Sequence, residues 1–305
     1  MGLAGALKLG TRGSKLALVQ AETVQRRFQQ AGIDVEIVPI KTSGDKGDRD
    51  QLGAFVREIQ RQTLSGNVDL GLHCLKDIPT ANLEGLRFSA FLERENPLDC
   101  LISRDGALDA LRPGAVVGTG SLRRTSQIAA LRPDLQFKPL VGNVDTRLQK
   151  LRNGEYDAIV LAIAGLDRLG LTSNWPYPDI QVQVIDVEML MPAPGQAVLV
   201  LETREGETHG EFLHHGPTKA CSIAERAFLK RFGGGCSVPV GAYATTRDNR
   251  LILRGLVASA DGKEIHKGQV EGPAQEAEEL GKRLAGQVGG QGGFRIVDEI
   301  MGARI

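Results

Sequence analysis

The stretch Leu7-Lys8-Leu9-Gly10-Thr11-Arg12-Gly13-Ser14 decides how this chain of 305 residues is interpreted. Its first three residues are typical of a short strand, and its glycines then break the strand pattern. From Lys15 to about Ala31, apolar residues recur at helical spacing. A strand, a glycine turn and a helix in this order open an α/β unit, so we expect a sheet with helices packed on it.

The following residues continue the same alternation of strands and helices. Residues 33–40 are rich in β-branched side chains and are predicted to form a second strand. A helix is expected over 55–64, and strands are expected over 67–73 and 86–92. The polar loop over 41–51 is predicted to be solvated, and a role as a lid is the alternative.

The opening arrangement returns near the middle of the chain. Ala115-Val116-Val117 is followed by Gly118-Thr119-Gly120-Ser121 and by a helical pattern over 122–131. Gly154-Glu155-Tyr156-Asp157, before an apolar run, also echoes Gly66-Asn67-Val68-Asp69. These repeats predict two lobes of similar α/β architecture, with a cleft between them.

The last third of the chain has a different pattern. A helix is expected over 221–232, two or three alternating strands over 240–270, and a helix over 274–288. This predicts a small third domain of the α+β class. The predicted domains are 1–94 with 194–212, 95–193, and 216–305.

Composition excludes several classes of partner. The 37 basic and 37 acidic residues cancel, so no global charge favours nucleic acid or an acidic membrane. No stretch is apolar over the length of a membrane span. The four cysteines lack the spacing of a disulfide framework or zinc site, and His209, His214 and His215 fit a polar linker better than a metal site. A reducing cytoplasm, no metal and no nucleic acid or membrane partner are therefore expected.

One cysteine lies in an unusual setting. In Phe232-Gly233-Gly234-Gly235-Cys236-Ser237, three glycines remove every Cβ before the thiol and let a bulky group approach the sulfur. The alternative is that Cys236 is a small buried hydrophobic residue, as free cysteines most often are.

Both glycine turns are candidate anion sites. Each would place backbone N–H groups at a helix N-terminus and would add guanidinium groups, which together bind carboxylate or phosphate. The alternative is that the serines are ordinary N-caps and the arginines lie in water. The candidates are Arg12 and Ser14 in the first turn, Ser121, Arg123 and Arg124 in the second, and Arg147 beyond it.

Lys76 and Asp77 follow a predicted strand and precede Pro79. Side chains at the carboxyl ends of strands in an open α/β sheet face the ligand crevice. A carboxylate beside cations stays ionised, and is suited to accept an N–H or to stabilise developing positive charge. A capping role, or pairing with Lys76, is an equal alternative for Asp77.

Six motifs together resemble the porphobilinogen deaminase (hydroxymethylbilane synthase) family over nearly the whole chain. In chain order they are Thr11-Arg12-Gly13-Ser14-Lys15-Leu16-Ala17-Leu18, His73-Cys74-Leu75-Lys76-Asp77-Ile78-Pro79, Gly118-Thr119-Gly120-Ser121-Leu122-Arg123-Arg124, Gly142-Asn143-Val144-Asp145-Thr146-Arg147-Leu148, Pro194-Gly195-Gln196 and Gly234-Gly235-Cys236-Ser237-Val238-Pro239-Val240-Gly241.

The resemblance implies a monomeric cytoplasmic transferase of tetrapyrrole and heme biosynthesis, with two periplasmic-binding-protein-like α/β lobes and a third small α+β domain. It implies a dipyrromethane cofactor joined to Cys236 by a thioether, and porphobilinogen as the substrate. Four porphobilinogen units would be added with loss of ammonia, and Asp77 would hold pyrrole N–H groups. The residues implied to bind the acetate and propionate groups are Arg12, Ser14, Lys76, Thr119, Ser121, Arg123, Arg124, Arg147 and Gln196.

The chain departs from the family pattern at two positions where a cation is usual. Leu52 replaces a lysine and Val141 replaces an arginine, while Gly120 and Cys74 each replace a serine. A charge-assisted hydrogen bond contributes roughly 1.5–3 kcal/mol, so weaker substrate binding is expected unless Lys46 or Arg49 compensates. The alternatives are a divergent family member with poor turnover or another pyrrole substrate, and a non-catalytic two-lobed protein that binds small carboxylates.

Overall fold

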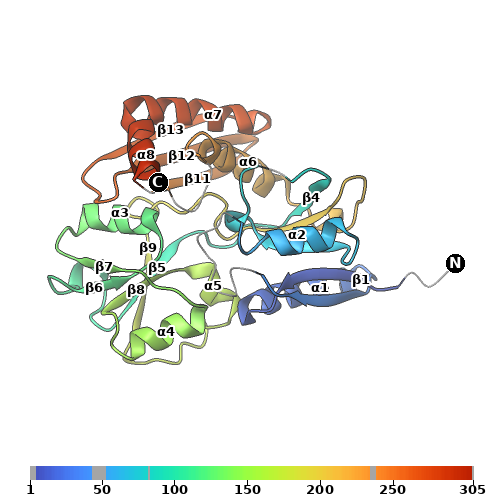
Figure 1. Cartoon of the computed structure of the whole chain (residues 1–305), viewed down its shortest axis with the longest axis horizontal. Coiled ribbons are helices and arrows are strands. Elements are labelled where there is room, and N and C mark those ends of the chain that lie inside the picture. The colour runs from blue at the N-terminus through green and yellow to red at the C-terminus, as the bar shows by residue number, and fades with distance from the viewer. Residues whose placement is uncertain (1–4, 43–52, 82, 234–237, 304–305) are drawn as a thin grey trace. The chain divides into compact units, whose positions relative to one another are not determined.

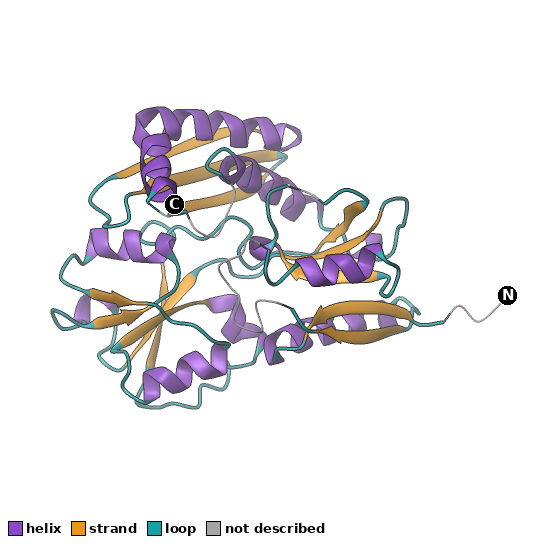
Figure 2. Ribbon diagram, viewed as in Figure 1, coloured by secondary structure: helices purple, strands orange, loops and turns teal. Residues whose placement is uncertain are grey.

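The structure is a computed structural model that describes residues 5–42, 53–81, 83–233 and 238–303. Its described residues form helices and strands of the mixed α/β class (Figure 2). The chain divides into two compact units. The first is Met1–Glu95 with Ala197–Lys219, and the second is Asn96–Gln196 with Ala220–Ile305.

The first unit contains a five-stranded sheet of order β2-β1-β3-β10-β4. Strands β2, β1 and β3 run parallel, and β10 runs antiparallel to both β3 and β4. The strand β10 comes from much later in the chain. The elements are β1 (Leu7–Arg12), α1 (Lys15–Gln30), β2 (Val35–Ile40), α2 (Arg57–Leu64), β3 (Leu70–Cys74), the short 3₁₀ helix η2 (Leu75–Asp77), β4 (Leu86–Phe91) and β10 (Leu199–Arg204).

Helices cover both faces of this first sheet. Leu70 and Leu72 of β3 are buried in one cluster with Phe28 of α1. The intervening Gly71 faces Ile59 and other residues of α2 on the opposite side. Successive strand residues point to opposite faces, so the continuous apolar character of β3 follows from burial on both sides.

The second unit contains a sheet of the same design, with the order β7-β6-β8-β5-β9. Leu101 and Val160 pack in a cluster with Ile128 of α3, whereas Ile159 packs in the cluster that holds Leu148 of α4. Figure 1 shows α3 and α4 on opposite sides of this sheet. The elements are β5 (Asp99–Ser103), β6 (Val116–Gly118), α3 (Leu122–Leu131), β7 (Gln136–Lys138), α4 (Val144–Arg152), β8 (Ala158–Ala162), α5 (Ile163–Arg168) and β9 (Gln181–Ile185).

The echoed aspartates make the same contact in both lobes. Asp69 accepts a hydrogen bond from the backbone N–H of Lys8 at 2.8 Å, and Asp157 accepts one from Val116 at 2.7 Å. In each case the aspartate N–H also donates to the carbonyl of the same partner at 2.9 Å. Each aspartate therefore fixes the start of the first parallel strand, and the two lobes are structural repeats.

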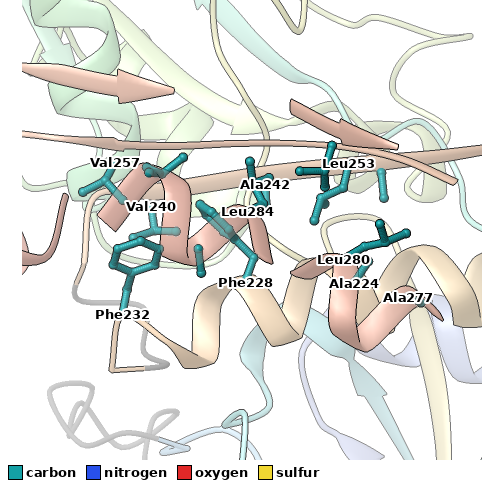
Figure 3. Packing of buried hydrophobic residues seen from close by; sticks show 14 of the residues in the cluster. Ala224, Phe228, Phe232, Val240, Ala242, Leu253, Val257, Ala277, Leu280 and Leu284 are labelled. Atoms are coloured by element: carbon teal, nitrogen blue, oxygen red, sulfur yellow. The ribbon is translucent and has the colours of Figure 1, made fainter. Parts of the chain in front are cut away.

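The rest of the second unit is a three-stranded antiparallel sheet covered on one face by helices (Figure 3). Phe228 of α6 and Leu280 and Leu284 of α7 pack on Val240 and Leu253 of the strands. The elements are α6 (Gly216–Lys230), β11 (Val240–Arg247), β12 (Arg250–Ala258), β13 (Ile265–Pro273), α7 (Ala277–Val288) and α8 (Phe294–Gly302).

A tight turn of this third sheet contacts α3 directly. Gly262 has φ +74°, and a Cβ at this position would lie 2.2 Å from the carbonyl oxygen of Ser126. Only glycine permits both the left-handed backbone and the close approach. The turn between β12 and β13 therefore packs on the backbone of the helix that carries Arg123 and Arg124.

The predicted fold class, two α/β lobes and a small α+β domain, is confirmed. The exact domain bounds stay a prediction. The sequence interpretation missed β5, β7, α4, α5 and α8, and it started α6 five residues late. Strand β5 contains three consecutive apolar residues and β7 has only three residues, so neither shows an alternating period. Helix α4 carries Val144, Leu148 and Leu151 at helical spacing, a signal that the sequence interpretation did not use.

Candidate functional site

At the carboxyl edge of the first sheet lie Arg12, Lys76 and Asp77. Arg12 ends β1, and η2 with Lys76 and Asp77 follows β3 directly. Because β1 and β3 are parallel neighbours, both ends meet at one edge. Lys76 and Asp77 are half-buried, and the turn between them and β3 is anchored by Leu75, which is 1% exposed. A carboxylate and two cations thus share the position where α/β sheets bind ligands.

Two further contacts define this edge. The Arg12 guanidinium lies over the ring of Phe55, 4.0 Å from its centroid, which is the geometry of a cation–π interaction. Ser14 is the N-cap of α1, and its hydroxyl oxygen accepts from the N–H of Ala17 at 3.4 Å. The ordinary capping role that the sequence allowed for Ser14 is therefore present.

The second glycine turn is built differently. The Thr119 hydroxyl, on a residue that is 5% exposed, accepts from the N–H of Ser121 at 3.1 Å and closes the turn. Ser121 is the N-cap residue of α3, but its side chain makes no capping hydrogen bond. The Ser121 hydroxyl therefore differs from that of Ser14, since the helix does not use it.

Arg123 and Arg124 do not lie in water. They are 4% and 7% exposed, and both pair with Asp99, which is 0% exposed. The Asp99 carboxylate lies 2.8 Å from Arg123 and 2.7 Å from Arg124. Burial lowers the pKa of Arg123 from its ordinary value, and the charge of Asp99 opposes that shift. Within this triad two guanidinium groups face one carboxylate, which leaves a net positive charge.

The guanidinium groups are also held by backbone carbonyl oxygens. Arg123 donates to the carbonyl of Met191 at 2.7 Å, and Arg124 donates to that of Val160 at 3.0 Å. Asp99 begins β5 and pairs with Ala162, the last residue of β8. The triad therefore lies at the carboxyl edge of β8, the counterpart of the edge that carries Asp77 in the first sheet.

Gln196 joins this triad. It is 0% exposed, and its Nε2 donates to the carbonyl of Pro97 at 2.7 Å and to Asp99 at 2.9 Å. An amide nitrogen has two hydrogens, so both are used inside the protein.

Arg147 lies on α4, which follows β7 at the same edge. Its Nε donates to the carbonyl of Gly142 at 2.8 Å, and Asn143 caps the helix through the N–H of Thr146 at 2.9 Å. Val141, where the family pattern has a cation, is 50% exposed.

The structure thus collects the predicted residues in two groups, one in each unit. Arg12, Ser14, Lys76 and Asp77 belong to the first unit, and Thr119, Ser121, Arg123, Arg124, Arg147 and Gln196 belong to the second. Cys236 and the 43–52 stretch with Leu52 lie outside the described residues. The cleft between the lobes and the approach of Cys236 to Asp77 stay predictions.

Three buried carboxylates were missed from the sequence, those of Asp99, Glu202 and Glu225. Asp99 opens the apolar run Cys100-Leu101-Ile102, and an ionisable residue in such a run needs a partner. Glu225 is 0% exposed and lies four residues after Cys221 and three before Phe228, on the buried face of α6. An acidic residue at that spacing was a usable signal.

The described cysteines differ in exposure. Cys74 is half-buried, while Cys100 and Cys221 are buried. Burial raises the pKa of the Cys100 thiol to about 12, so this thiol is unreactive at neutral pH. Among the described residues, no cluster of three or more His, Cys, Asp or Glu side chains has the arrangement of a metal site. The described helices include none with the length and apolar character of a membrane span.

Comparison with known proteins adds the following. The family model described as "Porphobilinogen deaminase, dipyromethane cofactor binding domain" matches residues 7–211, and "Porphobilinogen deaminase, C-terminal domain" matches residues 219–288. A porphobilinogen deaminase of Thermus thermophilus is 46% identical over 301 residues, covering 96% of this chain and 98% of its own. That of Desulforudis audaxviator is 45% identical over 293 residues, covering 91% and 92%.

Among solved structures, the periplasmic VFT2 domain of Bordetella pertussis BvgS is similar with a TM-score of 0.42 and 16% identity, covering 68% of this chain and 83% of that chain. An ancestral arginine-binding protein bound to arginine has a TM-score of 0.38 and 15% identity, covering 70% and 90%.

Proposed function

The chain belongs to the porphobilinogen deaminase family, and on that premise we propose that it is a transferase that condenses four porphobilinogen molecules stepwise onto a dipyrromethane primer. Water then cleaves the bond between the four added units and the primer and supplies the hydroxyl group. The products are hydroxymethylbilane and ammonia, within tetrapyrrole and heme biosynthesis. The observation that carries the proposal is the match of both family models along the chain, together with cations and a carboxylate at the carboxyl edges of both sheets.

The residues fit a dipyrromethane cofactor. When bound, this group supplies the pyrrole α-carbon to which the first substrate unit is joined. Its carboxylates need cations and N–H or O–H donors. The second unit offers the net positive triad of Asp99, Arg123 and Arg124. It also offers the hydroxyl of Ser121, which makes no capping hydrogen bond to the helix. We propose Cys236 as its point of attachment, because Cys236 lies in the glycine-rich motif that the family shares.

Asp77 is proposed to act on the reacting rings. Each condensation breaks the bond from porphobilinogen to its amino group, forms one carbon–carbon bond and releases a proton from the attacked pyrrole. A half-buried carboxylate can accept the pyrrole N–H and can stabilise the positive charge that develops when ammonia leaves. Its place directly after β3 fixes it on a rigid element.

The remaining polar residues are proposed to bind the acetate and propionate groups. Arg12 and Lys76 supply cations in the first unit, and Arg147 extends the cationic edge in the second. The hydroxyls of Ser14 and Thr119 accept backbone N–H groups, so each still has its own hydrogen to donate to a carboxylate. Because the protein has no net charge, binding a chain of carboxylates requires local cations of this kind.

Val141 offers a way to test the missing cation. Because its side chain is 50% exposed, Val141→Arg can be made without repacking the core. If a cation at this position binds substrate, the KM for porphobilinogen falls by about tenfold, the equivalent of one charge-assisted hydrogen bond. An unchanged KM would show that a cation at this position does not bind substrate.

Intact mass of the purified protein tests the proposed function directly. We expect a mass increase equal to a two-pyrrole adduct, a coloured product with an aldehyde reagent for pyrroles, and consumption of porphobilinogen with release of ammonia. Cys236→Ala should remove the adduct and the activity together. A non-catalytic carboxylate-binding protein would have no adduct and would bind its ligand unchanged after Cys236→Ala.

We also propose that the enzyme acts as a monomer in the cytoplasm, as the family resemblance implies. Light scattering during gel filtration should give a mass near the 32.7 kDa of one chain, and a stable dimer would contradict the proposal.

A further inference from the structure

Resting on the function proposed above, we propose that Glu225 is a positioning residue for the guanidinium pair of Arg123 and Arg124. It acts through the backbone of Gly195, the side chain of Gln196 and the carboxylate of Asp99. Every contact in this route lies within the second unit.

Glu225 is a buried carboxylate that holds two separate segments. Its Oε2 accepts from the backbone N–H of Gly195, and its Oε1 accepts from that of Ala244 in β11, both at 2.7 Å. The side chain is 0% exposed. Short hydrogen bonds to an ionised acceptor in a buried place are strong and directional, so Glu225 fixes Gly195 relative to the third sheet.

Gln196 links the fixed backbone of Gly195 to the Asp99 carboxylate. Gln196 follows Gly195, and its two amide hydrogens bind the carbonyl of Pro97 and the carboxylate of Asp99. Its side chain therefore orients Asp99. The same Asp99 oxygen, Oδ1, accepts from Gln196 at 2.9 Å and from Arg124 at 2.7 Å.

The backbone around Gln196 needs such a fixed support. Gly195 has φ +73°, and Ala197 has φ +66°, which is uncommon for a residue with a side chain. A conformation of this kind persists only where surrounding contacts determine it. The Glu225 carboxylate is one of those contacts.

Stability alone does not account for a carboxylate at this place. Removing a charge from water is costly, and a well-packed apolar side chain is often as good or better for stability. The Glu225 carboxylate instead fixes the positions of the backbone N–H groups of Gly195 and Ala244. For a guanidinium pair that must meet ligand carboxylates, a displacement of about 1 Å is enough to weaken binding strongly.

The test compares Glu225→Gln with a matched variant, Glu202→Gln. In Glu225→Gln, the new side-chain amide presents its NH₂ group to one of the two backbone N–H donors, so one hydrogen bond is lost. Glu202 is also buried, at 3% exposed, and accepts from Gln60 at 3.0 Å, but it belongs to the first unit. Melting temperature, KM, kcat and the fraction of chain with the adduct are measured for the full-length protein.

Glu225→Gln should raise the KM for porphobilinogen by about tenfold and lower the adduct-bearing fraction, whereas Glu202→Gln should lower the melting temperature with an unchanged KM. An equal change of KM in both variants would show that Glu225 is only structural, and would overturn the proposal.

A double-mutant cycle tests the route. If Glu225 acts through Gln196, adding Glu225→Gln to Gln196→Ala should change KM little further, and additive effects would overturn the proposal. Should Glu225→Gln fail to fold, Gln196→Asn tests the same link with Glu225 in place. KM must then rise, and an unchanged KM overturns the proposal.

Measurements on the unsubstituted protein distinguish a failure of the proposed function from a failure of the role of Glu225. If it carries the adduct and consumes porphobilinogen but Glu225→Gln behaves like Glu202→Gln, only the role of Glu225 fails. If it carries no adduct and leaves porphobilinogen intact, the proposed function fails and this role fails with it.

Discussion

Replacing Asp99 by asparagine removes the only carboxylate of a buried triad. Asp99 is 0% exposed, and its two oxygens lie 2.7 and 2.8 Å from Arg124 and Arg123. Asparagine has nearly the same shape, but it has one oxygen and an NH₂ group. That NH₂ group would face a guanidinium donor, and two buried positive charges would lose their compensation.

The size of the effect follows from burial. Removing one partner of a buried ion pair costs about 3–5 kcal/mol, because the other charge stays away from water. The arginines cannot turn outward cheaply, since Arg123 and Arg124 also donate to the carbonyls of Met191 and Val160. At roughly 2–4 °C for each kcal/mol in a unit of this size, the melting temperature should fall by about 6–20 °C.

The assay is thermal unfolding followed by circular dichroism, with Asp134→Asn as the control. Asp134 also pairs with an arginine, Arg132, at 2.7 Å, but the Asp134 side chain is 36% exposed. Exposed ion pairs contribute little, so the control should shift the melting temperature by less than about 2 °C. Equal shifts in the two variants would refute the reasoning that burial of the triad makes Asp99 essential.

Three other substitutions have expected outcomes. Asp77→Asn should lower turnover of porphobilinogen by about 10²–10³-fold with the melting temperature unchanged, and retention of full activity would contradict its proposed role. Gly262→Ala should lower the free energy of unfolding in denaturant by about 2–4 kcal/mol, because a Cβ would overlap the carbonyl oxygen of Ser126. The control is Gly170→Ala, where φ is +70° and the space around the Cβ is open. It should lose only about 1 kcal/mol, the cost of the left-handed backbone conformation. Burial raises the pKa of the Cys100 thiol from 9.0 to about 12, so the thiol ionises at lower pH in the unfolded chain than in the folded protein, and stability should fall as pH rises above 9. Between pH 7 and pH 10 the free energy of unfolding should fall by about 1.4 kcal/mol more in the unsubstituted protein than in Cys100→Ala. Equal losses in the two proteins would contradict this prediction.

Local patterns predicted the larger elements well. The helix over 122–131 has the predicted bounds, and the strands of the third sheet start at the predicted residue 240 and end three residues beyond the predicted 270. The echo of Asp69 in Asp157 was also informative, because each carboxylate binds the first parallel strand of its own sheet. Such features depend on residues close in sequence, or on a repeat of them.

The triad and its support could not be derived in the same way. Arg123 and Arg124 were predicted to bind ligand carboxylates or to lie in water, and their pairing with Asp99 was not foreseen. The sequence does not show that Asp99, more than twenty residues earlier, starts a strand beside β8. Likewise, nothing local joins Glu225 to Gly195. These contacts are set by sheet order, and that order depends on strands taken from distant parts of the chain.

The place of β10 inside the first sheet has a consequence for synthesis on the ribosome. Strand β4 pairs with β10 and not with β3, so residues 86–91 have no neighbour until residues 199–204 have been translated. At 5–20 residues per second, the roughly one hundred intervening residues take about 5–20 s. During that interval the nascent first lobe exposes two unpaired strand edges, which makes it a natural client for chaperones that bind emerging chains.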